Sequence, residues 1–319
     1  MPWPSVKGLL PDWSISAFES ESGLLELKAF AAKHFGLKIG ADGKLLRGNQ
    51  APAKFKTKSN TDIGAVEASR GIATSCARIV ARASKSHAVD KNLSMENPAE
   101  LRNLALQLSK HNWVDFEALV KACWAVNVPV LYLPELGTVG QKMDGMVTFV
   151  SGKSVIILTK RAKPDWLLFI LAHEIGHIGR GHLDNIEGEA ILDETISKDS
   201  NIDVQEIQAN EYAISLVTPD GKGLKLKTLL NAQAFANAAV RHGTEHGISP
   251  GHVILSAANN TKIGGKPLFS LGNAALNKLP ANLVSRPVEE VCSEALAQNI
   301  DLDSVSSNSY EFLEKMRIV

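Results

Sequence analysis

The sequence predicts an α+β protein in which a small β-region is flanked by helical regions on both sides. Segments with helical periodicity recur along the chain, whereas β-rich runs gather between residues 128 and 160. Apolar residues make up 45% and charged residues 21% of the chain, a composition typical of folded proteins and not of disordered ones. The length exceeds that of one small core and suits two or three units. We predict three, over residues 1–110, 111–220 and 221–319.

The N-terminal unit is predicted to be mainly helical. Residues 1–22 have no period, and the turn signal Asp42-Gly43 lies in a stretch, 40–58, without sustained periodicity. Asn97 followed by Pro98 is typical of a helix start, with a capping side chain and a proline in the first turn. The helices predicted up to the β-region span residues 23–35, 62–83, 97–110 and 115–126.

The middle unit combines the predicted strands with two helices. A strand is expected over 128–133, and a hairpin over 145–150 and 154–159. The helix predicted over 164–179 is strongly apolar, and an acidic stretch without period separates it from a helix over 204–217. The C-terminal helices are predicted over 224–241, 250–258, 287–298 and 304–316, so all strands are expected within 128–160.

Charge and cysteine content exclude several classes of protein. The chain has 34 basic and 34 acidic residues, so it is not basic or acidic throughout. Its three cysteines are far apart and odd in number, which fits neither a disulfide framework nor a paired-cysteine metal site. No apolar run approaches the roughly 20 residues that span a bilayer, and no secretory signal is visible. We therefore expect a cytoplasmic protein that does not contact a membrane.

The segment His173-Glu174-Ile175-Gly176-His177 is the strongest chemical signal. Two histidines four apart on a helix project from one face, at a spacing that allows both imidazoles to bind one zinc ion. Glu174 is turned about 100° from His173, which suits a general base better than a third ligand on the same helix. Seven apolar residues precede His173, so the helix is expected to be buried, where ionisable groups need partners.

A third ligand must come from elsewhere in the chain. His182 follows His177 by five positions, one fewer than the metzincin spacing requires, so that arrangement is excluded. A carboxylate on the helix over 204–217 is the other common solution, and this helix offers Glu206 and Glu211. Helical periodicity alone does not choose between the two.

The segments Phe169-Ile-Leu-Ala-His-Glu-Ile-Gly-His-Ile178 and Glu206-Ile-Gln-Ala-Asn-Glu-Tyr-Ala213 together resemble the ImmA/IrrE family of metallopeptidase-like proteins. These are zincins of the gluzincin type, whose third ligand is the Glu of a Glu-x-x-Ala-Asn motif. The resemblance extends over about 113–219 and implies a zincin-like core, in which a small sheet lies beside the active-site helices. It assigns the third ligand to Glu206, with Asn210 and Ala213 matching, and implies one Zn²⁺ per chain.

The function implied by this resemblance is regulatory proteolysis. Glu174 would be the catalytic base of a zinc endopeptidase that cleaves a transcriptional repressor or an antitoxin in a stress, mobile-element or defence response. Asn210, Tyr212 and His182 are candidates to support a ligand or to donate to the oxyanion. The alternative is a zinc-containing binding module that regulates a transcription factor or nucleic acid without proteolysis. A helix-turn-helix is not recognisable, so the sequence leaves direct nucleic-acid binding open.

A second histidine pair and a basic segment are two further features of the sequence, and each also has a simpler explanation than a functional site. His242 and His246 repeat the four-residue spacing, but Gly243 and Gly247 indicate a helix C-terminus, where histidine is favoured without a metal. Residues 44–91 contain ten Lys or Arg against three acidic residues, a net charge of +7. This basic segment fits a nucleic-acid or acidic-partner surface, or a solvated helix face, and the second reading is the default.

Overall fold

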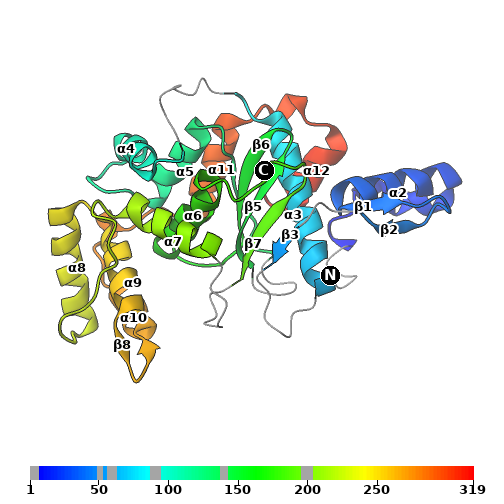
Figure 1. Cartoon of the computed structure of the whole chain (residues 1–319). Helices are drawn as coiled ribbons and strands as arrows, with labels where there is room; N and C mark the ends of the chain where they lie inside the picture. Colours follow the sequence, from blue (N-terminus) through cyan, green and yellow to red (C-terminus); the bar gives the residue numbers. More distant parts are fainter. Residues whose placement is uncertain (1–6, 49–52, 56–62, 87–94, 137–142, 195–203) are drawn as a thin grey trace.

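The computed structural model describes residues 7–48, 53–55, 63–86, 95–136, 143–194 and 204–319. The fold is α+β, as predicted, and is built around a mixed five-stranded sheet with the strand order β3-β7-β5-β6-β4 (Figure 1). The outer pairs β3–β7 and β4–β6 are parallel, whereas β5 runs antiparallel to both β6 and β7. These strands span Ala53–Phe55 (β3), Val130–Tyr132 (β4), Met143–Val150 (β5), Lys153–Leu158 (β6) and Ala190–Glu194 (β7).

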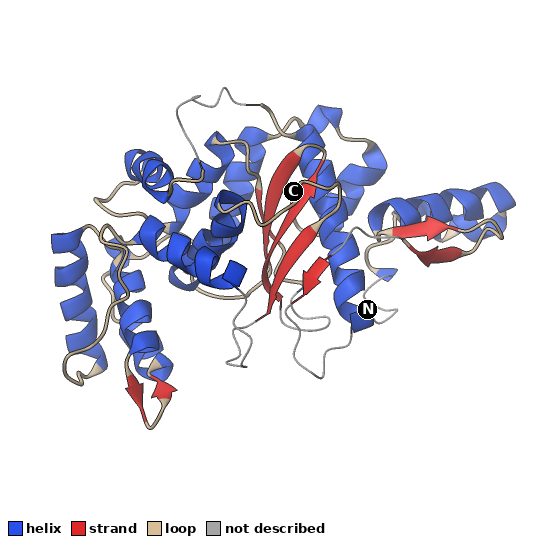
Figure 2. Ribbon diagram, viewed as in Figure 1, coloured by secondary structure: helices blue, strands red, loops and turns tan. Residues whose placement is uncertain are grey.

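Helices cover both faces of this sheet. Helix α3 (Ile63–Ala83) packs against β5 and β6 from one side, and α6 (Pro164–Gly179) packs against the same two strands from the other (Figures 1 and 2). Helix α7 (Val204–Val217) lies along α6. The remaining helices span Glu21–His34 (α2), Pro98–Leu108 (α4), Phe116–Ala125 (α5), Val204–Val217 (α7), Ala232–His246 (α8), Pro250–Asn260 (α9), Phe269–Leu276 (α10), Val288–Asn299 (α11) and Ser307–Lys315 (α12).

Helix starts are set by local side chains, as the sequence predicts. The Asn97 side chain accepts a hydrogen bond from the backbone N–H of Ala99, and Pro98 occupies the first turn of α4. Asp115 caps α5 in the same way by accepting from Ala118 N–H. Each cap satisfies a backbone donor that has no partner within its helix, typically worth about 1 kcal/mol.

The prediction that all strands lie within 128–160 is wrong. Strand β7 lies inside the sheet, between β3 and β5, although the sequence around it is acidic and reads as irregular. Its apolar residues Ala190, Ile191 and Leu192 are buried, but three residues are too few to give a period-2 signal. The other strands outside this range are shorter still: Leu37–Ile39 (β1), Leu45–Arg47 (β2), Ala53–Phe55 (β3), Lys262–Ile263 (β8) and Lys266–Pro267 (β9).

The helix predicted over 224–241 begins only at Ala232. The preceding segment is non-helical because side chains of α9 and its C-cap bind its backbone: Leu224 N–H donates to Ser256 Oγ, and Leu226 N–H donates to Thr261 Oγ1. Asn231 then caps α8 by accepting from Ala234 N–H. Tertiary hydrogen bonds thus override the apolar periodicity of this segment.

The main hydrophobic core takes residues from all three predicted units. For example, the rings of Phe30 and Phe35 in the N-terminal unit both contact Phe312 of α12. A second apolar cluster joins α8, α9 and α10. The division into three units stays a prediction. Among the described residues, no helix is long and apolar enough to cross a membrane.

Two buried histidines predict acid sensitivity. Burial lowers the pKa of His34 and of His252 to about 4, helped by the positive charges of Lys33 and Arg102 respectively. The unfolded chain therefore binds protons that the folded chain does not, so stability is present above about pH 6.5 and is lost as the pH falls towards 4. Between pH 7 and pH 5 each histidine is expected to cost roughly 2 kcal/mol of unfolding free energy.

Urea unfolding at pH 7 and pH 5 measures this cost. His34 is packed between the rings of Phe30 and Phe312, so His34→Phe should remove its share of the pH dependence. His246→Gln, at an exposed position of α8, is the matched control and should leave the pH dependence unchanged. If His34→Phe and the wild type lose the same unfolding free energy between pH 7 and pH 5, this histidine already binds a proton in the folded protein.

Candidate metal centre

Helix α6 carries the histidine pair into the interior. Pro164 occupies its first turn, and the apolar residues that follow are buried against the sheet and neighbouring helices. His173 is 7% exposed, and Glu174 and His177 are fully buried. Consecutive turns of the helix place the two imidazoles edge to face, with ring centroids 4.8 Å apart and their Nε2 atoms 3.1 Å apart.

Helix α7 brings a carboxylate to this pair because α6 and α7 approach closely. A Cβ on Gly176 would lie 2.7 Å from the carbonyl oxygen and 2.9 Å from the Cα of Ala209. Only glycine fits there against the backbone of α7. As a result Glu206 reaches both histidines, with 3.4 Å between its Oε2 and His173 Nε2 and 3.6 Å between its Oε1 and His177 Nε2.

The distances among these three side chains fit a metal site. Two ligands at 2.0–2.1 Å from a tetrahedral zinc ion lie roughly 3.3 Å apart, and the observed separations are 3.1, 3.4 and 3.6 Å. Two imidazole nitrogens and one carboxylate are also the donor set of catalytic zinc sites, which leave one position open. His173, His177 and Glu206 are thus a buried group that could hold a metal ion.

Of the two carboxylates that the sequence offers on α7, only that of Glu206 lies beside the histidines. Glu206 is buried beside the histidines, whereas Glu211 is exposed on the far side of α7. The two carboxylates are five residues apart, about 140° around the helix, so only one can face α6.

Hydrogen bonds orient both imidazoles. Asn210 Oδ1 lies 3.1 Å from His173 Nδ1, and an amide oxygen there accepts the Nδ1 proton. His182 Nδ1 lies 2.9 Å from His177 Nδ1, and His182 Nε2 lies 3.0 Å from Gln208 Oε1. If Gln208 accepts from His182, then His182 accepts from His177. Both metal-side nitrogens, the Nε2 atoms of His173 and His177, then carry lone pairs that face Glu206.

The carboxylate of Glu174 packs against strand β5. A Cβ on Gly145 would collide with Glu174 Oε1 and would lie 2.8 Å from its Cδ, so a side chain at position 145 would displace the carboxylate. The pairing of β5 with β7 shifts register between Met143 and Gly145, a bulge next to this contact. Bulges of this kind commonly lie beside active sites.

The remaining predicted residues lie as follows. The Tyr212 hydroxyl donates to the carbonyl oxygen of Met95 at 2.6 Å, and its side chain is fully buried. Its hydrogen bond is therefore to the segment before α4 and not to the cluster. His242 and His246 lie in the last turns of α8, which ends at Gly247 in the left-handed conformation, as the sequence predicts. His246 Nδ1 lies 3.0 Å from the carbonyl oxygen of His242.

Sequence reasoning missed Gln208 and Gly145. Gln208 is two residues from Glu206 on an exposed part of α7, and its contact with His182 depends on the fold of residues 180–189. Gly145 opened a predicted strand, where glycine is an unfavourable choice. That unfavourable residue was the available signal of a close approach.

A small sheet beside a helix that carries His-Glu-x-x-His, with a carboxylate from the following helix, defines the class of zincin-like metallopeptidases. Residues 123–243 match the family model of the IrrE N-terminal-like domain, Peptidase_M78. This match overlaps the part of the chain that resembles ImmA/IrrE metallopeptidases in sequence, and it confirms that resemblance. Comparison with curated proteins and with solved structures gave no significant match.

A series of substitutions tests the metal ligands. Glu206→Gln removes the charged donor and should lower metal affinity by more than about 100-fold, whereas Asn210→Ala removes only the partner of His173 and should cost about 10–100-fold. Glu211→Gln is the matched control on the exposed face of α7 and should retain wild-type affinity. Competition with a chromogenic chelator measures all three. A larger loss in Glu211→Gln than in Glu206→Gln would reverse the ligand assignment.

Proposed function

We propose that this protein is a zinc-dependent endopeptidase that cleaves a regulatory protein, such as a transcriptional repressor or an antitoxin, in a stress, mobile-element or defence response. The observation that carries the proposal is the approach of Glu206 to His173 and His177 at the separations of a metal site, with Glu174 on the same helix. The match to a metallopeptidase family over residues 123–243 supports the same chemistry.

Each side chain has a distinct part in this proposal. His173, His177 and Glu206 hold one zinc ion per chain, which when bound supplies Lewis acidity for peptide hydrolysis. Glu174 accepts the proton of the attacking water and later returns it to the leaving amine. Asn210 and His182 keep the imidazoles in the tautomer that presents Nε2 to the ion. Gly145 leaves room for the Glu174 carboxylate beside β5.

Two observations support a narrow range of substrates: the burial of the candidate ligands and Glu174, and the resemblance to the ImmA/IrrE family. The ligands and Glu174 are at most 9% exposed, so a peptide must be presented in a specific way to reach them. A site of this kind favours one partner over general digestion. The resemblance to ImmA/IrrE proteins makes a regulator of gene expression the expected partner.

A second candidate, a zinc-containing regulatory binding module without proteolysis, is favoured by the same burial. Structural metal sites are closed, and a buried Glu174 would then serve packing. The two candidates differ in their need for Glu174, because only hydrolysis uses a general base.

Co-expression with candidate repressors and antitoxins, followed by mass spectrometry of new protein N-termini, tests the proposal. We expect a discrete cleavage product with the wild-type protein and none with Glu174→Gln. A partner that co-purifies intact with both proteins, and whose activity changes equally with both, would favour the binding module.

A further inference from the structure

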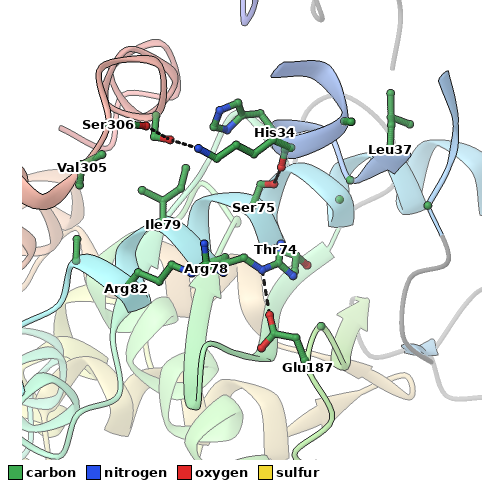
Figure 3. Close-up of a pocket in the computed structure, with 18 of the residues that line it drawn as sticks. His34, Leu37, Thr74, Ser75, Arg78, Ile79, Arg82, Glu187, Val305 and Ser306 are labelled. Carbon is green, nitrogen blue, oxygen red and sulfur yellow. Dashed lines mark hydrogen bonds and ion pairs between the residues drawn. The ribbon is translucent and has the colours of Figure 1, made fainter. Parts of the chain in front are cut away.

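A cavity of about 650 Å³ lies apart from the metal ligands, on the α3 face of the sheet (Figure 3). Its walls come from α2 and β1, from α3, and from the segment that leads into α12. Small-molecule sites typically enclose about 300–1,000 Å³. The cavity therefore has the size of a ligand site, and none of the three candidate metal ligands borders it.

The charged groups around the cavity are mostly cationic. Lys33, Lys38, Arg78 and Arg82 border it, and the carboxylate among its lining residues is that of Glu187, which leaves a local excess of three positive charges. Two of these cations belong to the basic segment 44–91. An excess of this size in a concave site favours an anionic ligand.

Helix α3 presents a row of donors to this cavity. Thr74, Arg78 and Arg82 follow one another at four-residue spacing, so they lie on one face of the helix. Arg78 donates through Nε to Glu187, and Arg82 donates through Nε to Ser151 Oγ. Within the described part of the chain, the terminal Nη groups of both arginines make no hydrogen bond. Like charges one turn apart disfavour a helix, and a bound anion would offset that repulsion.

Two buried polar side chains at the cavity also have no hydrogen-bond partner among the described residues. Thr74 is 8% exposed, and its hydroxyl is unpaired. His34 is 1% exposed, and both of its ring nitrogens are unpaired. Buried polar atoms without partners cost about 1–3 kcal/mol each, and these atoms lie beneath the cavity surface, so the groups that can meet a ligand there are the arginine side chains.

The cavity also has apolar walls. Leu37, Ile79 and Val305 border it from the three different parts of the chain, as Figure 3 shows. An inorganic phosphate would fill only a small part of 650 Å³, and it would leave these side chains without contact. The combination of paired arginines with an apolar surface fits a phosphate ester that carries an organic group.

We propose that this cavity binds a small organic phosphate, with its phosphoryl oxygens on Arg78 and Arg82 and its organic group against Leu37, Ile79 and Val305. The lining residues come from three separate parts of the chain and form a concave site, which suits a small molecule better than the continuous backbone of a nucleic acid.

Isothermal titration calorimetry on the full chain tests the binding. The probes are nucleoside monophosphates and hexose phosphates, with adenosine, glucose and inorganic phosphate as the matching fragments. We expect at least one phosphate ester to bind at least tenfold more tightly than its uncharged counterpart and than inorganic phosphate. The proposal is overturned if no ester exceeds its fragments, or if a single-stranded oligonucleotide binds through Arg78 and Arg82 while no ester does.

Variants separate ligand binding from a structural role of the Arg78–Glu187 ion pair. Arg78→Gln and Arg82→Gln should each weaken binding about tenfold, the effect of losing one charge-assisted hydrogen bond. Glu187→Gln breaks the same ion pair but removes a negative charge, so it should strengthen binding. Arg241→Gln, at an exposed position of α8, is the control and should change nothing. Equal weakening by Arg78→Gln and Glu187→Gln would assign the arginine a structural role and overturn the proposal.

Discussion

Glu174→Gln is expected to lower the rate of substrate cleavage by about 10²–10⁴-fold while the protein keeps its fold and its metal. The amide has the shape of the carboxylate, so it fits the space beside Gly145, but it cannot take the proton of the attacking water. The metal is held by other side chains, and α6 is anchored by its buried apolar residues. Cleavage of the identified partner under single-turnover conditions measures the loss.

Glu211→Gln is the control for this experiment because it removes one carboxylate from the exposed face of α7. It should cleave at the wild-type rate. A pH profile adds a second readout, since loss of a general base is expected to change the pH dependence of cleavage. If Glu174→Gln retains full biological output while ligand variants lose it, the metal is structural and the binding-module hypothesis replaces the peptidase.

The second large effect is expected on removing the two imidazoles. Wild-type protein should carry about one zinc, or a substituting divalent ion, per chain, and His173→Ala/His177→Ala should carry none. The double variant should also lose the stabilisation that metal binding contributes, so adding zinc should raise the Tm of the wild type alone. Elemental analysis and thermal unfolding with and without a chelator measure both effects.

His242→Ala/His246→Ala is the matched control, because it removes a second histidine pair with the same spacing from the exposed end of α8. It should retain the metal and the zinc-dependent rise in Tm. Stoichiometric metal in the first double variant would contradict the assignment of the site. Loss of metal in the control would show instead that the helix end of α8 holds the ion.

Close packing explains why the carboxylate of α7 was hard to assign from sequence. The pattern of α7 places Glu206 and Glu211 on different faces, but both faces carry apolar neighbours, so neither is marked as buried. The approach of Gly176 to Ala209 selects the face that meets α6. Both residues are small, which is typical of a close contact between helices. Small residues alone do not show which two helices are in contact, so the sequence did not reveal this approach.

The strands outside 128–160 were missed for a related reason. Strand β7 is short and set among acidic residues, and it is held by β3 and β5, which are distant in the sequence. Similarly, residues 224–231 are non-helical because two of their backbone N–H groups donate to the hydroxyl groups of Ser256 and Thr261 in place of helical carbonyl groups. Local periodicity carries no information about strands or hydroxyl groups that lie far away in the sequence and bind a segment only in the folded protein.

The sequence by itself determined the features that depend on one helix. The spacing of His173 and His177, the position of Glu174 beside them and the start of α6 at Pro164 follow from 3.6 residues per turn and from local capping. Only the tertiary structure determined the contacts between different helices and strands. These contacts bring Glu206 to the histidine pair, place His182 and Gln208 next to His177, and pack Gly145 against Glu174. They also form the cationic cavity beside α3. The reason is physical, because covalent geometry sets distances within a helix, whereas the sizes of side chains at each contact set how closely two elements approach.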